Sequence, residues 1–131
     1  MRQDEHQEQV TLFAWARLVE SRYPELALLF AVTNGGARNV VTGQRLKQEG
    51  VKRGVPDVWL PVARGGYHGL VIELKAGRGQ PSAEQKAWLK ALAAQGWLAR
   101  VCVGCESARE LLVQYLDGDC RKSAAEIGEE G

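Results

Sequence analysis

The sequence predicts a single α/β domain, a mixed β-sheet flanked by helices, and three observations lead to this prediction. Two apolar runs between residues 58 and 75 are joined by a short segment with two glycines, which indicates an antiparallel hairpin. A clear helix then separates the second run from a further strand-like run, as a right-handed crossover between parallel strands requires. Helical patterns lie at both ends of this region. Open sheets of this kind carry their chemistry at strand ends.

The N-terminal third predicts a helix, a strand and a loop. Residues 6–22 have the apolar spacing of an amphipathic helix, and Pro24 is expected to stop it. The apolar run at 26–33 is interpreted as a buried strand that enters a loop at Asn34-Gly35-Gly36.

The middle of the chain predicts a short helix and the hairpin. Thr42 is a candidate N-cap for a helix that runs through Lys47 and ends near Gly50. Strands are expected at 58–62 and 70–75, with the turn between them.

The C-terminal third predicts a helix, a fourth strand and a closing helix. Ser82 is expected at an N-cap, Gln85 at the reciprocal capping-box position and Gly96 at the helix stop. The strand is expected at 97–104 and the closing helix at 107–117.

Length and composition favour an ordinary globular domain. A chain of 131 residues buries roughly two-thirds of its unfolded surface, so it needs no stabilising metal or disulfide. No apolar run approaches the ~20 residues of a membrane-spanning helix, and the polar, acidic N-terminus shows no signal peptide. We therefore expect a cytoplasmic protein without a membrane partner. Residues 1–117 are expected to form the domain and residues 118–131 a flexible acidic tail.

The three cysteines favour free thiols in a reducing compartment. Cys102 and Cys105 form a C-x-x-C pair, which leaves half of a zinc site or a redox pair as alternatives. Because Cys102 lies within a β-branched run, it is interpreted as a small buried apolar residue.

The net charge of +1 does not by itself indicate a nucleic-acid partner. One local stretch is basic, however, with a single opposing acid, Glu49. A basic stretch in a neutral protein suits a polyanion on one face, although a solvated loop has the same composition. Its basic residues are Arg38, Arg45, Lys47, Lys52 and Arg53.

Three residues of the hairpin are candidates for chemistry. Strand alternation places Glu73 and Lys75 on one face, and antiparallel pairing brings Asp57 opposite them. Two converging carboxylates repel each other unless a cation lies between them, and Mg²⁺ prefers carboxylates with water and phosphate oxygens. The main-chain carbonyl of Leu74 could be a further ligand. Lys75 would then lie beside a metal-bound water.

The alternative interpretation is an exposed sheet edge. Pro-Asp commonly starts a turn, and Glu-x-Lys on one strand face is an ordinary surface ion pair. The apolar neighbours, the hairpin geometry and the capped helix that follows favour a site.

These residues resemble the PD-(D/E)XK nuclease superfamily, with Pro56-Asp57 as the first motif and Glu73-Leu74-Lys75 as the second. The flanking segments "TNGGARN", "GVKRGVPD" and "LKAGRGQPSAEQKAWL" are similar to those of the virus-type replication-repair nuclease branch, the VRR-NUC domain. The resemblance covers about Glu20 to Val103. It implies a restriction-endonuclease-like fold with an α-β-β-β-α-β core.

The resemblance also implies roles for further residues. Glu20 matches a helical acidic residue that approaches the metal, although it could equally be a solvated glutamate. Gln85 matches a glutamine that faces the site and is kept as a candidate supporting residue of the catalytic set, although a side chain folded back in a capping box is not expected to reach a water as well. The loop residues that would hold DNA phosphates are Asn34, Gly35, Gly36 and Arg38; a plain tight turn is the alternative. Arg45, Lys47, Lys52 and Arg53 would contact the DNA backbone without reading sequence.

The resemblance therefore implies a Mg²⁺- or Mn²⁺-dependent DNA endonuclease, with Asp57 and Glu73 as metal ligands and Lys75 assisting the nucleophile. Stand-alone members of the branch imply a homodimer that cuts branched DNA such as four-way junctions, and two-fold symmetry suits paired cuts. Two alternatives stay open: a non-catalytic DNA-binding subunit with the same fold, and a sequence-specific restriction-type enzyme.

Overall fold

The computed structural model describes residues 4–33 and 40–123. The predicted phosphate-binding residues Asn34, Gly35, Gly36 and Arg38 lie outside the described residues. The elements, in chain order, are α1 (Glu5–Leu18), a 3₁₀ helix (Pro24–Leu28), β1 (Phe30–Ala31), α2 (Val40–Gln48), β2 (Val58–Leu60), β3 (Leu70–Lys75), α3 (Ala83–Ala94), β4 (Leu98–Val103) and α4 (Cys105–Leu116).

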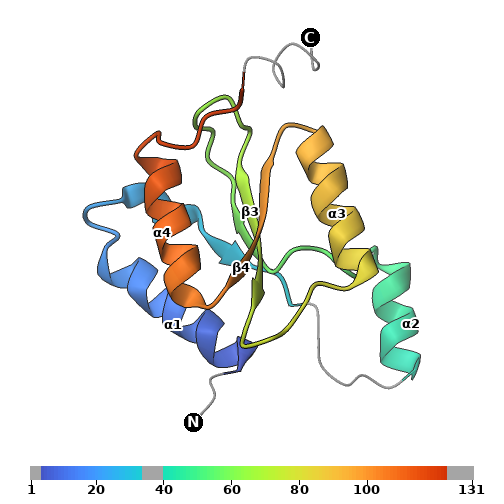
Figure 1. The fold of residues 1–131 in the computed structure, drawn as a ribbon. Coiled ribbons are helices and arrows are strands. Elements are labelled where there is room, and N and C mark those ends of the chain that lie inside the picture. The colour runs from blue at the N-terminus through green and yellow to red at the C-terminus, as the bar shows by residue number, and fades with distance from the viewer. Residues whose placement is uncertain (1–3, 34–39, 124–131) are drawn as a thin grey trace.

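The four strands form one mixed sheet in the order β1-β2-β3-β4. The β1–β2 and β2–β3 pairs are antiparallel, and the β3–β4 pair is parallel across the α3 crossover. Helices α1 and α4 lie on one side of the sheet, while α3 and α2 lie on the other (Figure 1). The predicted mixed α/β sheet flanked by helices is therefore confirmed, and β3 lies inside the sheet between two strands and two helical layers.

Capping signals explain where two of the helices begin. The Asp4 carboxylate accepts from the Gln7 main-chain N–H at 2.8 Å, and the Gln7 amide oxygen accepts from the Asp4 N–H, so α1 begins at Glu5. The predicted capping box of Ser82 and Gln85 is present at the start of α3. Gly96, with φ of +93°, follows the end of α3 as predicted.

The predicted strand at 26–33 is wrong over most of its length. Pro24 starts a 3₁₀ helix, and Leu26 and Leu29, one 3₁₀ turn apart, are both buried. Only two residues then pair with β2. Apolar residues that the sequence aligned with a strand instead enter the core from a tight helical turn.

Two predicted boundaries also differ. Helix α2 begins at Val40, so Thr42 is inside the helix and is not its N-cap. The predicted tail from residue 118 does not hold for 118–123. Cys120 packs against the core, and the Lys122 main-chain N–H donates to the carbonyl of Gly65 at 2.8 Å.

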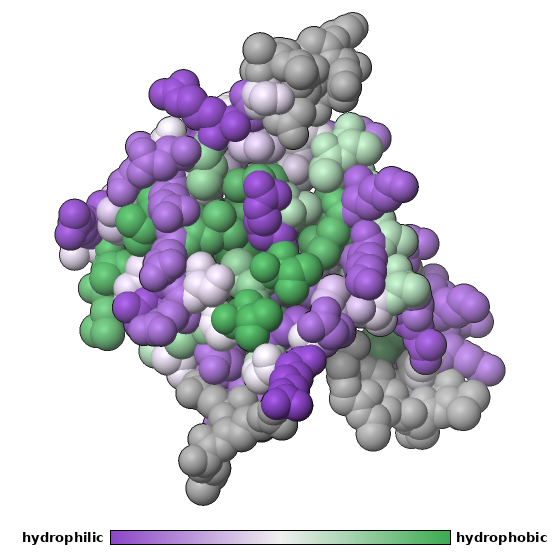
Figure 2. Space-filling model, in the orientation of Figure 1, coloured by the Kyte–Doolittle hydropathy of each residue, from purple (hydrophilic) through white to green (hydrophobic). Residues whose placement is uncertain are grey.

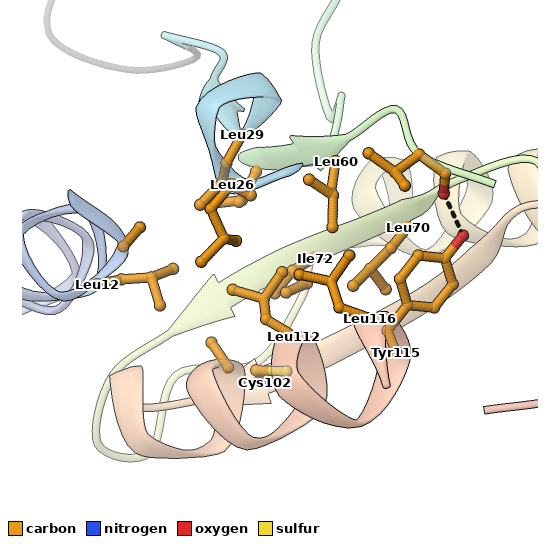
Figure 3. Close-up of a cluster of buried hydrophobic side chains, with 14 of the residues drawn as sticks. Leu12, Leu26, Leu29, Leu60, Leu70, Ile72, Cys102, Leu112, Tyr115 and Leu116 are labelled. Carbon is orange, nitrogen blue, oxygen red and sulfur yellow. Dashed lines mark hydrogen bonds between the residues drawn. The ribbon is translucent and has the colours of Figure 1, made fainter. Parts of the chain in front are cut away.

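The main core lies between the sheet and the pair α1 and α4. Leu12, Ile72 and Leu112 are completely buried there, contributed by α1, β3 and α4 (Figure 3). The Tyr115 hydroxyl donates to the carbonyl of Val62 at 2.5 Å. Burial raises the pKa of Tyr115 to about 12, so this donor stays protonated at neutral pH. No helix within the described residues combines the length and apolar character needed to cross a membrane.

Candidate active site

The C-terminal half of β3 carries two charged side chains in a buried position. The register of β3 places Leu70, Ile72 and Leu74 in the main core, so Glu73 and Lys75 face the α3 side of the sheet. Glu73 is only 1% exposed and Lys75 only 8%. Lys75 Nζ lies 3.8 Å from Glu73 Oε2. A surface ion pair would be solvated, so the exposed-edge interpretation is wrong for these two residues.

Asp57 is fixed against the same end of β3. The β2–β3 register ends with Val58 opposite Ile72, so Asp57 continues toward Glu73. Its Oδ2 accepts from the main-chain N–H of Leu74 at 3.0 Å. Because the N–H and C=O of one strand residue point to the same side, the Leu74 carbonyl is directed toward Asp57 as well. The sequence prediction that Asp57 meets the strand at Glu73 and Lys75 is thus consistent with the geometry.

Gln85 uses both ends of its amide. Its Oε1 accepts from the Ser82 N–H at 2.8 Å, which completes the capping box. Its Nε2 donates to Glu73 Oε2 at 3.0 Å. The expectation that a capping glutamine cannot also reach the site is therefore wrong, because an amide offers an acceptor and a donor on opposite sides of one plane. The cap positions the donor that holds Glu73.

The other carboxylate oxygen of Glu73 has a different environment. Oε1 is buried and receives no hydrogen bond from the residues that the structure describes. Burial, and after it the neighbouring Asp57 carboxylate, raises the pKa of Glu73 to about 9. Lys75 opposes this shift only partly. Without a cation, Glu73 is therefore protonated at neutral pH, and the pair carries one negative charge fewer than its sequence suggests.

The acidic first turn of α1 meets this end of the sheet. Glu5 Oε1 lies 3.7 Å from Lys75 Nζ, so the Lys75 amino group lies between the side chains of Glu5 and Glu73. Glu8 Oε2 accepts from the main-chain N–H of Cys105 at 2.6 Å. Gly104 offers no side-chain cap to α4, so Glu8 provides one from another helix.

The structure does not bring Glu20 to the site, and the acidic residue of α1 that reaches Lys75 is Glu5. Glu20 is exposed and lies two residues beyond the end of α1 at Leu18. Since α1 rises about 1.5 Å per residue, roughly 20 Å of helix separates that end from Glu5. The available signal was the capping box at Asp4, which starts the helix at Glu5; the sequence does not show which end of the helix meets β3.

The cysteines do not form a metal site in the part of the chain that the structure describes. Cys102 is buried in the core as predicted, and Cys105 is the first residue of α4. Burial raises the pKa of both thiols. Over residues 4–33 and 40–123, no three Asp, Glu, His or Cys side chains are grouped as a metal-binding set. A cation at Glu73 would therefore depend on two carboxylates completed by main-chain and water oxygens.

A basic surface leads toward the site from the α3 side. Arg45 and Lys47 lie in the last turn of α2, and Lys52 and Arg53 lie between α2 and Asp57; all four are exposed. The Trp88 indole N–H donates to the Arg53 carbonyl at 3.0 Å, which holds this segment against α3. Four exposed positive charges thus precede Asp57 in the chain, two on α2 and two in the segment that follows it.

The chain is similar to known proteins in sequence and in fold. The model of the VRR-NUC domain family matches residues 2–106. A solved structure described as a VRR_NUC domain protein superposes with a TM-score of 0.77 at 26% identity, covering 90% of this chain and 92% of that one. No curated protein matches the chain.

Proposed function

Because the chain belongs to the VRR-NUC domain family, we propose that it is a Mg²⁺- or Mn²⁺-dependent endonuclease that hydrolyses DNA phosphodiester bonds. The observation that carries this proposal is the convergence of Asp57, Glu73 and Lys75 at the end of β3. A protein that only binds phosphates gains nothing from placing two carboxyl groups, one of them buried, where the substrate anion must come.

The residues present fit a hard divalent cation. Asp57 and Glu73 supply carboxylate oxygens, and the Leu74 carbonyl is directed to the same side. The buried Glu73 Oε1 lacks a donor within the described residues, and a cation would satisfy it. When bound by these groups, a divalent cation supplies Lewis acidity that lowers the pKa of a water and stabilises charge on the phosphate.

The protein side chains have separate tasks in this scheme. Gln85 holds one oxygen of Glu73 and so directs the other outward from its buried position. Lys75, held by Glu73 and Glu5, donates to the attacking water or to a phosphate oxygen as negative charge develops. Glu5 replaces Glu20 as the helical acidic residue. The phosphorus–oxygen bond to the leaving nucleotide breaks as the water oxygen bonds to phosphorus.

Backbone contacts position the substrate. The exposed Arg45, Lys47, Lys52 and Arg53 would bind phosphates on the α3 side without reading bases. The substrate that we favour is branched DNA such as a four-way junction, cut by a homodimer with one site per chain.

The test is a cleavage assay on four-way junction, flap, nicked and linear duplex DNA with each metal. We expect Lys75→Ala to lose at least about 100-fold in rate, on the order of losing one donor to the developing negative charge, while Lys90→Ala, which changes an exposed lysine on α3, cuts like the parent. Asp57→Asn should still bind DNA without cutting it. No cleavage of any substrate with either metal, or full activity of Lys75→Ala, would refute the proposal. Discrete sequence-defined fragments from plasmid DNA would instead identify a restriction-type enzyme.

A further inference from the structure

Among the residues that the structure describes, no strand pairs with the outer edge of β4, which is a regular strand edge with outward main-chain groups. β4 is the last strand of the sheet. The main-chain N–H groups of Leu98 and Gly104 donate to the carbonyls of Gly69 and Lys75 on the β3 side. The main-chain N–H and C=O groups of the even-numbered residues of β4 therefore point toward β3. By alternation, the main-chain groups of Ala99, Val101 and Val103 point outward.

The side chains along this edge are apolar and exposed. Val101 is 39% exposed and Val103 is 51% exposed, although their partners Glu73 and Lys75 on β3 are buried. Figure 2 shows the apolar strip that runs over β4 between α4 and α3. One outward main-chain group of this edge has a side-chain partner within the described residues. The Arg100 guanidinium donates to the Ala99 carbonyl at 3.2 Å.

Strand edges in monomeric proteins are usually blocked by several devices, and within the described residues this edge carries one of them, the exposed Arg100. Proline, inward charges and bulges are the common devices that prevent edge pairing, and Leu98–Val103 pairs with β3 without a bulge and contains no proline. The opposite edge, β1, has only two residues and cannot offer a comparable template.

We propose that the β4 edge binds the same edge of a second copy of this chain in antiparallel register, with Val101 opposite Val101 of the partner subunit. This inference specifies how the proposed homodimer is joined, and it does not depend on the nuclease chemistry.

The sequence of β4 is self-complementary in this register. Ala99 faces Val103 of the partner subunit, and Arg100 faces Cys102 of the partner subunit, so the outward main-chain groups pair and the exposed side chains meet apolar ones. A register centred on Arg100, one residue nearer the N-terminus of each strand, would place the two Arg100 side chains opposite each other. The opposite shift would bring Ala99 against α4. The Val101 register is therefore favoured over both neighbours.

The pairing would extend the sheet across both subunits. A two-fold axis perpendicular to a sheet keeps equivalent faces on the same side, so the two Glu73 side chains would face the same way. Glu73 lies beside Val101, and three strand spacings of about 4.8 Å place the two catalytic strands roughly 14 Å apart. Both sites would then be presented to one substrate.

The first test is the mass of the protein in solution, measured by sedimentation equilibrium without DNA or metal. We expect about twice the chain mass of 14.4 kDa for the parent at micromolar concentration. Val101→Lys should reduce the mass to that of one chain. Val10→Lys, which changes a more exposed valine (51%) on α1, should leave it doubled. A parent of single-chain mass, or a Val101→Lys protein that stays doubled and folded by circular dichroism, would overturn the proposal.

The second test does not depend on how Val101→Lys folds. Directly opposed residues of an outward pair lie about 5.5 Å apart at Cα, within reach of a disulfide. Val101→Cys should therefore form a dimer-linking disulfide in oxidised glutathione, above the background of the parent. Val103→Cys should not, because its partner is Ala99. Equal cross-linking of both variants, or of neither, would reject this register and with it the interface.

Discussion

Replacing Glu73 by glutamine tests whether this carboxyl group is held protonated by the fold. In the metal-free protein its pKa is raised from 4.5 to about 9, first by burial and then by Asp57. The folded state therefore binds a proton that the unfolded chain releases between these two pH values. Stability from this group is fully present below about pH 4.5, falls as the pH rises, and is lost by about pH 9.

The expected magnitude follows from the same pKa. Between the unfolded-state and folded-state pKa values, ionisation of this one group lowers the unfolding free energy by about 1.4 kcal/mol per pH unit. From pH 6 to pH 8, the parent should lose about 2.7 kcal/mol relative to Glu73→Gln, which does not ionise. Glutamine retains an oxygen to accept from Gln85, so the exchange removes the charge and keeps the hydrogen bond.

The assay is urea unfolding with a chelator present, at pH 6, 7 and 8, on the parent, Glu73→Gln and the control Glu110→Gln, an exposed glutamate on α4. The unfolding free energy of Glu110→Gln should change with pH as that of the parent does. If Glu73→Gln also runs parallel to the parent across this range, the carboxyl is already ionised in the fold, and the reasoning about its buried environment fails.

Three further predictions concern other contacts of the fold and site. Glu8→Ala should cost about 1–2 kcal/mol in urea unfolding, because α4 loses the carboxylate that caps its first N–H; a change below 0.3 kcal/mol would contradict this. Tyr115→Phe should cost about 1–3 kcal/mol, since a buried carbonyl loses its donor, and an unchanged midpoint would contradict it. Glu5→Gln should weaken DNA cleavage by about 10-fold or more, as expected for a change beside Lys75, whereas Glu20→Gln should leave it unchanged; the reverse order would restore the assignment made from sequence.

Local signals predicted much of the fold. Residues 83–94 have a cap at Ser82 and a glycine stop at Gly96, and both act through hydrogen bonds within one turn of the chain. The hairpin was predictable for the same reason. The run at 26–33 was not, because leucines three residues apart suit a 3₁₀ turn as well as a strand, and only packing against the core decides between them.

The sequence by itself determined the central part of the site. A period of two places Glu73 and Lys75 on one face, and a short hairpin connection brings Asp57 beside them whatever else the chain does. Tertiary structure alone decided that Glu5, and not Glu20, joins them, and that Gln85 serves the cap and the site together. It also decided that the valines of β4 stay exposed beside buried charges. Periodicity specifies the face of an element on which a residue lies; which end of that element meets another, and which edge stays open, depends on long-range packing that no local pattern records.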